Sequence, residues 1–328
     1  MKLRFGALGL GLLSMLSFVF AIQWGAANIS VTDVVTCLVS ECDSAVTQSI
    51  LWQIRVPRAV MGFLVGAGLA CCGAILQTAT RNPLADPYLF GIVAGAGLGV
   101  VVVNLVFPGT PLALMPFAAF AGALLSVLFV LALARYFFRV EMILLAGVAI
   151  AFMFGAITQL LLYVGEPFAS NRIIFWLMGS LSSASFTQIS ILLPLLISAF
   201  FMVLLSHRQL DALLLDDDTA TTLGVNVPML RVLLLLGCAL ITAVIVAFCG
   251  GIGFVGLMLP HIVRFLFGGT SARLLVGCFF VGGIFLMWVD VLAKELLSGQ
   301  EIPIGIITSA IGSLFFIGLM VQSKRHAG

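Results

Sequence analysis

The sequence predicts an all-α protein that crosses a membrane many times, through about ten helices. Its 328 residues are 62% hydrophobic and only 9% charged. An average soluble domain is roughly 45–50% apolar and about 25% charged. A soluble chain with so few charges could not cover its surface, and a disordered chain would need low hydrophobicity. A lipid bilayer is therefore the expected solvent.

Apolar stretches of membrane-spanning length recur along the chain, separated by Pro, Gly or charged residues. A transmembrane helix needs about 20 mostly apolar residues. The first stretch, Phe5 to Ile22, is a retained span or a cleaved signal peptide, and we expect a span because it is long for a signal sequence. A polar loop of about 26–50 follows. The later spans are expected at about 57–79, 92–107, 113–134, 142–164, 190–206, 229–249, 252–267, 274–297 and 304–321.

The basic residues predict the orientation. Ten spans place both termini on one side, and cytoplasmic loops carry an excess of Lys and Arg. The expected cytoplasmic side then holds eleven basic residues, namely Lys2, Arg4, Arg81, Arg135, Arg139, Arg208, Arg231, Arg264, Arg273, Lys324 and Arg325. The outer side holds four, namely Arg55, Arg58, Arg172 and Lys294. We expect both termini in the cytoplasm and a single permease domain over 1–328.

Two helices begin alike, which suggests an inverted-topology repeat. Val56-Pro57 precedes a long apolar run that would point inward, and Val227-Pro228 precedes one that would point outward. Repeats of opposite orientation are common in transporters. We hold the repeat as a hypothesis.

Several chemistries are disfavoured. Gly251 to Gly256 matches G-x-G-x-x-G, but a dinucleotide site needs a preceding strand and an acid about 20 residues on, so a bend between two spans is expected instead. None of the three lysines follows a glycine, so there is no P-loop for ATP. Few ionisable residues fall in mid-span, which disfavours an ion-coupled carrier and an intramembrane hydrolase. The three histidines are scattered and indicate no metal site. A net charge of +2 gives no sign of a nucleic-acid partner.

Two pairs of residues invite local interpretations. Asp290 and Lys294 are one helical turn apart and can form an ion pair. Cys37 and Cys42 lie in the polar loop and can form a disulfide if it faces an oxidising compartment. The other five cysteines fall in apolar stretches and are expected to be buried.

The loop at about 207–228 is expected to hold a short helix on the cytoplasmic surface. Asp216 and the acids after it suit a helix start, and Gly224 suits its end. An ordinary solvated connection is the alternative. Because a short isolated helix is marginal, and Leu213 to Leu215 are apolar, a docking helix is favoured.

Six motifs in order resemble a known family. They are QIRVPR (53–58), NPLADP (82–87), ATTLGV (220–225), GFVGL (253–257), PHIVR (260–264) and EIPIG (301–305). Together they resemble the permease subunit of binding-protein-dependent ABC importers for iron chelates, haem or vitamin B12, the FecCD-type family.

The resemblance implies a set of partners. They are a second permease subunit, expected to be identical, two ATP-binding subunits that carry ATP and Mg²⁺, and a periplasmic binding protein. The chain itself would be no enzyme and would hold no cofactor. It would be a multi-pass protein of the bacterial inner membrane, in contact with lipid.

The resemblance also implies residue roles. Arg55 and Arg58 match arginines that receive acidic residues of the binding protein, and Lys294 matches a third basic docking position. The ATPase coupling residues would be Asp216, Thr219, Thr222, Leu223 and Gly224. The cytoplasmic gate would involve Asn82, Leu84, Val140 and Glu141, although the last two depart from the small hydroxyl residues of the vitamin B12 permease.

The expected cargo is a bulky iron chelate, with a ferric siderophore first and haem next. The segment 210–225 looks more like ferric-chelate permeases than the vitamin B12 permease. A vitamin B12 permease and, further off, an ion-coupled secondary transporter remain as alternatives.

Overall fold

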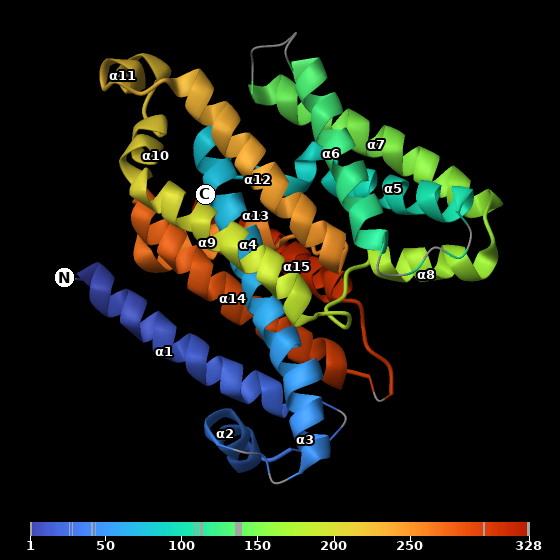
Figure 1. Ribbon diagram of the computed structural model, residues 1–328. Helices are drawn as coiled ribbons and strands as arrows, with labels where there is room; N and C mark the ends of the chain where they lie inside the picture. Colours follow the sequence, from blue (N-terminus) through green and yellow to red (C-terminus); the bar gives the residue numbers. More distant parts are fainter. Residues whose placement is uncertain are drawn as a thin grey trace. The chain divides into compact units, whose positions relative to one another are not determined.

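The computed structural model describes residues 2–25, 27, 29–40, 42, 44–107, 109, 111, 114–134, 140–297 and 299–326, with the backbone alone at 2–5, 134, 140–141 and 322–326. Within these residues every regular element is a helix (Figure 1). The α-helices are α1 (Lys2–Gln23), α2 (Val31–Val39), α3 (Ala45–Ser49), α4 (Val56–Thr80), α5 (Ile92–Val106), α6 (Met115–Ala134), α7 (Val140–Val164), α8 (Pro167–Leu177), α9 (Phe186–Leu205), α10 (His207–Leu213), α11 (Asp217–Thr222), α12 (Val227–Cys249), α13 (Val255–Phe267), α14 (Ser271–Glu295) and α15 (Ile304–His326).

The spans expected from hydropathy are present as helices. Eight helical segments in the described part of the chain are long and apolar enough to cross a membrane. Two shorter apolar helices, Ile92–Val106 and Val255–Phe267, occupy the remaining two expected positions. Pro260 lies inside α13. This proline interrupts the apolar run, so the span at 252–267 has the weakest hydropathy pattern of the ten. The multi-pass all-α prediction is confirmed, and the side on which the termini lie stays a prediction.

The polar segment before α4 is more ordered than expected. It contains α2, whose first turn has a reciprocal cap between Ser30 and Asp33. Cys37 and Cys42 are joined by a disulfide. A π-helical turn at Ile50–Arg55 then runs directly into α4. Such turns are rare and frequently lie at functional sites.

The chain divides into two compact units. The first comprises Met1–Ala74, Leu181–Arg208 and Phe254–Gly328. Within it, α14 packs against α1, α9, α13 and α15. A Cβ at Gly66 would lie 2.1 Å from the carbonyl oxygen of Gly282, so α4 and α14 approach closely at this glycine pair. Small residues permit such close packing between membrane helices.

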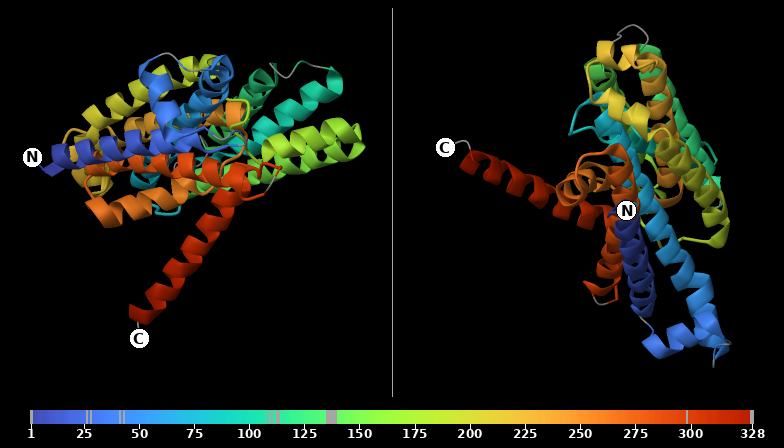
Figure 2. Two further views of the ribbon diagram at one scale, coloured as in Figure 1. Left: turned by 90° about the horizontal axis from the view of Figure 1, so that it is seen from below. Right: turned by 90° about the vertical axis from the view of Figure 1, so that its left-hand side faces the viewer.

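One helix of the first unit is only partly covered. α15 contacts α13 and α14 and then extends away from both, as both views in Figure 2 show. Its exposed apolar side chains include Leu314, Ile317 and Met320. α15 therefore presents an apolar surface that the described helices of this unit do not cover.

The second unit comprises Ile75–Ser180 and Gln209–Gly253. Its helices α5, α6 and α7 lie side by side, and α12 packs on α5 and α6 (Figure 1). Gly95 and Gly122 face each other, since a Cβ on either would come within 2.5 Å of the other's carbonyl oxygen. The unit also contains α8, a helix of 11 residues that hydropathy did not predict.

The G-x-G-x-x-G segment begins at a bend, as expected. α12 ends at Gly250, which has φ +69°, and a Cβ there would lie 2.0 Å from the carbonyl oxygen of Trp176. The backbone N–H of Ile252 donates to the Tyr88 hydroxyl at 3.1 Å. Helices α12 and α13, and no strand, flank the segment, so the fold around it is not that of a dinucleotide site.

Candidate functional sites

A buried arginine–acid cluster gathers around the start of α4. We define it as Arg58, Asp290, Lys294 and Glu301. The Nε of Arg58 donates to both carboxylate oxygens of Asp290 at 3.0 and 3.1 Å. Its two terminal nitrogens donate to Glu301 at 2.8 and 2.9 Å. The Lys294 ammonium lies 2.7 Å from Asp290, which confirms the pair expected from their spacing.

The cluster is electrically balanced and exposes only one member. Two cations, Arg58 and Lys294, face two carboxylates. The side chains of Arg58, Asp290 and Lys294 are 8, 3 and 13% exposed, whereas that of Glu301 is 49% exposed. Hydrogen bonds from Arg58 hold the pKa of Glu301 below its usual value. A partner that approaches this cluster therefore meets Glu301 before it meets either cation.

Arg55 is bound differently. Its side chain is buried, and its guanidinium donates to the carbonyl oxygens of Ile22 at 3.0 Å and Gln23 at 2.6 Å, and to that of Ala27. The last carbonyls of a helix have no partner within the helix. Arg55 thus caps the end of α1, a contact that sequence reasoning missed because 32 residues separate it from Gln23.

The predicted coupling residues come together on one short exposed helix. Asp216 accepts a hydrogen bond from the backbone N–H of Thr219 at 3.0 Å and so caps the start of α11. A hydrogen bond with Thr219 lowers the pKa of Asp216. The helix ends at Thr222, and its C-cap residue Leu223 is 63% exposed. Gly224 follows with φ +83°, a conformation that favours glycine. Thr222 is exposed as well.

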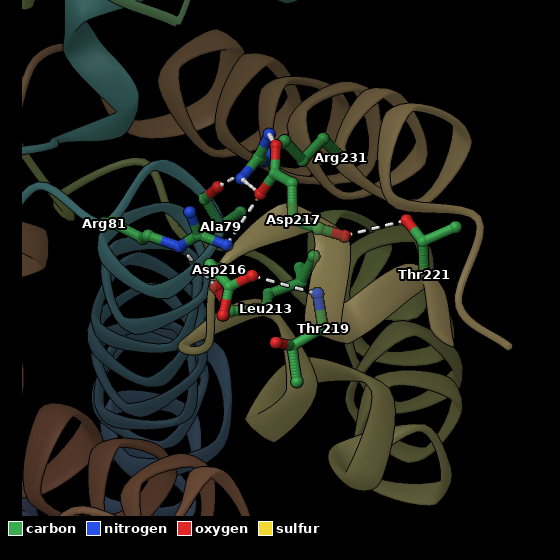
Figure 3. Close-up of polar contacts among 8 residues, drawn as sticks. All are labelled: Ala79, Arg81, Leu213, Asp216, Asp217, Thr219, Thr221 and Arg231. Atoms are coloured by element: carbon green, nitrogen blue, oxygen red, sulfur yellow. Dashed lines mark hydrogen bonds and ion pairs between the residues drawn. The ribbon is translucent and has the colours of Figure 1, made fainter. Parts of the chain in front are cut away.

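Asp217 forms contacts that the sequence analysis did not predict. Arg231, on α12, donates to both of its carboxylate oxygens at 2.9 Å. Arg81, which follows α4, donates to it at 2.7 Å (Figure 3). These hydrogen bonds, with that from Arg231 the largest contribution, lower the pKa of Asp217. Because Arg81 lies 136 residues away from Asp217 in the chain, no local pattern could have revealed the pair.

Two of the predicted gate residues are described. Asn82 and Leu84 follow α4, where the Asn82 side chain accepts a hydrogen bond from the Leu84 N–H at 2.9 Å. Leu84 is 58% exposed. The side chains of Val140 and Glu141 lie outside the described residues.

Asp86 is an unexpected feature of the same loop. Its Oδ1 accepts the Tyr88 N–H at 2.8 Å, while its Oδ2 is buried without a hydrogen-bond partner. Burial raises the pKa of Asp86 to about 6.

The apolar helices, the arginine–acid cluster and the exposed helix α11 are together the features of a multi-pass membrane permease. The sequence profile of the FecCD transport family matches residues 12–322. The chain therefore belongs to that family. It is a permease subunit of an ABC importer for substrates of the iron-chelate or vitamin B12 type, and it is located in the bacterial inner membrane.

Named relatives agree with this assignment. The chain is 37% identical over 308 residues to the Fe(3+)-citrate import system permease protein YfmE of Bacillus subtilis (strain 168), with 94% of this chain and 92% of the relative covered. It is 37% identical over 287 residues to the vitamin B12 import system permease protein BtuC of Salmonella typhi, with 86% of each covered. A solved structure, described as an inward-facing conformation of a metal-chelate type ABC transporter, matches with a TM-score of 0.86 and 30% identity, covering 96% of this chain and 98% of that one.

Proposed function

We propose that this permease pairs with a second copy of itself to form the path for a bulky ferric chelate. A periplasmic binding protein delivers the chelate, and two ATP-binding subunits, which hold ATP and Mg²⁺, supply the energy. A ferric siderophore is the first candidate cargo and haem the second.

The exposed helix α11 is the observation that carries this proposal. It has only six residues, and an isolated helix this short is marginal in water. It nevertheless presents Leu223 to solvent, on the loop where cytoplasmic coupling is expected. An exposed apolar side chain on a capped, oriented helix suits insertion into a groove of an ATP-binding subunit. The alternative of an ordinary connection gives no reason for this exposure.

The uncovered surface of α15 supports the second permease subunit. Its apolar side chains extend beyond the contacts with α13 and α14, and a second copy of α15 is the occupant that we propose. A cysteine in place of Leu314 should then form a disulfide-linked dimer on mild oxidation. A cysteine in place of Ser14, on α1, is the matched control and should not form one.

Docking of the binding protein is proposed at the arginine–acid cluster. Because Arg58 and Lys294 are already neutralised by Asp290 and Glu301, an incoming carboxylate has to compete for Arg58. Glu301 is the partly exposed member that it can displace. We propose that the acidic residue of the binding protein takes the place of Glu301 on Arg58, and that Arg55 contributes by holding the end of α1 beside this region.

The gate is proposed at Asn82 and Leu84. Both follow α4 immediately after Arg81, and Leu84 is exposed. Movement at the end of α4 would therefore reach them directly. Val140 and Glu141 remain proposed as the second part of the gate.

The cargo assignment is supported by the relatives. The Fe(3+)-citrate permease aligns with 94% of this chain and the vitamin B12 permease with 86%, at equal identity. Import of vitamin B12 is therefore kept as the alternative function, after a ferric siderophore and haem as cargo. The test is uptake by proteoliposomes that contain the permease with its ATP-binding subunits and binding protein, using ferric citrate, a ferric siderophore, haem and vitamin B12 side by side. Faster uptake of an iron chelate than of vitamin B12 supports the proposal, and the reverse order contradicts it.

A further inference from the structure

The carboxylate of Asp217 lies where four elements meet (Figure 3). Arg231 binds this carboxylate through both terminal nitrogens, and its Nε donates to the carbonyl oxygen of Ala79, near the end of α4, at 3.0 Å. Arg81 binds the same carboxylate, and its Nε donates to the carbonyl oxygen of Leu213, at the end of α10, at 2.7 Å. Asp217 thus connects α11 to α4, α10 and α12 through two side chains.

Only one of three consecutive aspartates makes these contacts. Asp216 caps its own helix, and Asp218 is exposed, without a hydrogen bond to either arginine. Of the three aspartates, only Asp217 is placed to bind Arg81 and Arg231. Asp218, an aspartate one residue away, is therefore a matched control position for mutation.

Stabilisation alone does not account for the arrangement. The Asp217 side chain is 50% exposed, and exposed ion pairs contribute little to stability. The guanidinium group, however, has a rigid fork of donors that fixes direction as well as distance. α11 is short and Ala220 is its one buried residue, so the bonds of Asp217 are side-chain contacts that hold the start of this helix against α12 and the residue after α4.

We call Asp217, Arg81 and Arg231 the clamp. One of its residues has an uncommon backbone conformation. Arg81 has φ +50°, which is rare for a residue other than glycine. This conformation ends α4 and directs the Arg81 side chain toward α11 (Figure 3). Asn82 and Leu84 follow at once, so the clamp adjoins the proposed gate along the chain.

We propose that Asp217, with Arg81 and Arg231 as its positioning partners, transmits movement of α11 to the ends of α4 and α12. The inference rests on the proposed function, in which α11 contacts the ATP-binding subunit. Asp217 keeps its charge across the physiological range, because its two arginines lower its pKa. The ion pairs of Asp217 with Arg81 and Arg231 therefore persist at physiological pH and move together with α11.

The test measures coupling in the complete complex. Proteoliposomes containing permease, ATP-binding subunits and binding protein are assayed for cargo uptake and ATP hydrolysis together, and the ratio of the two rates is compared. Asp217→Asn should lower uptake per ATP by about 5-fold or more, the lower end of typical coupling effects. Asp218→Asn should leave the ratio unchanged. Unchanged coupling in Asp217→Asn, or an equal loss in Asp218→Asn, overturns the proposal.

A double-mutant cycle separates transmission from general damage. Arg231→Gln should lower the ratio as well, and combining it with Asp217→Asn should add little, because both changes break the same contact. Additive losses overturn the proposal, as does loss of the ATP-binding subunits from purified Asp217→Asn complexes. If that variant fails to assemble in the membrane, Asp217→Glu, which keeps the charge, is measured in its place and should retain coupling. Absence of ATP-dependent uptake with the unaltered permease is a different result, because it refutes the proposed function itself.

Discussion

Replacing Arg58 with glutamine should destabilise the permease strongly. The change removes the guanidinium that contacts Asp290 through Nε and Glu301 through its terminal nitrogens. Asp290, with a side chain only 3% exposed, would then keep Lys294 as its remaining cation. Removing one partner of a buried ion pair costs about 3–5 kcal/mol. The Glu301 half adds at most about 1 kcal/mol, because that side chain is half exposed.

A matched variant tests the role of burial. Arg81→Gln also removes an arginine from a carboxylate, but Arg81 is 34% exposed and its partner Asp217 is 50% exposed. Exposed pairs contribute about 0.2–1 kcal/mol, so this variant should be nearly as stable as the unaltered permease. The same substitution, arginine to glutamine, should thus lower the free energy of unfolding several-fold more at Arg58 than at Arg81.

The assay is denaturant unfolding of the purified permease in detergent, with the reactivity of buried cysteine thiols as the readout. Cys71 and Cys278 are buried in the unit of Arg58, and Cys238 and Cys249 are buried in the unit of Arg81. Each pair should react only once its own unit opens. Arg58→Gln should shift labelling to clearly lower denaturant, and Arg81→Gln should not. Equal midpoints for the two variants would refute the reasoning from burial.

Individual contacts lead to four further predictions. Glu301→Gln should strengthen docking of the binding protein, measured as a lower Kd, because the side chain that competes for Arg58 loses its charge; weaker docking would contradict displacement. Since Arg58 lowers the pKa of Glu301, the native contact should persist down to pH values below the usual carboxyl pKa and weaken only below them. Gly66→Leu should cost at least about 1–3 kcal/mol, because a Cβ already meets the Gly282 carbonyl at 2.1 Å and overpacking strains the backbone; an unchanged unfolding midpoint would argue against close packing there. Burial raises the pKa of Asp86 in the folded chain to about 6, so the folded state holds this proton more tightly than the unfolded chain does. The unfolding midpoint should therefore rise as pH falls from about 6 toward 4, and Asp86→Asn should remove that increment, while an identical pH profile in the variant would exclude Asp86 as its source.

Much of the fold could be predicted because membrane helices are encoded locally. A run of apolar residues specifies its own helix in lipid, where each backbone polar group has to be satisfied within the segment. The expected span at 57–79 corresponds to α4 at Val56–Thr80, and 229–249 corresponds to α12 at Val227–Cys249. The helices that were missed, such as α2 and α8, are short, and their caps and tertiary contacts give no hydropathy signal.

Side-chain contacts in the candidate sites could be predicted only between residues that are close together in the sequence. The pair of Asp290 and Lys294 is one turn apart on a helix, so its spacing revealed it. The bonds of Arg58 to Glu301 and of Arg81 to Asp217 join residues 243 and 136 positions apart. Those partners come together only through folding. The resemblance to relatives indicated the basic residues and the coupling helix, yet it did not show that Asp290 and Glu301 of the same chain already pair with Arg58.

Chelate uptake driven by ATP decides whether this chain works as the permease of an ABC importer. Proteoliposomes carrying the permease, its ATP-binding subunits and ATP in the compartment that these subunits face are supplied with loaded binding protein on the other side. We expect iron chelate to accumulate only when both ATP and functional ATP-binding subunits are present. Accumulation by the permease alone under a proton or sodium gradient would contradict it.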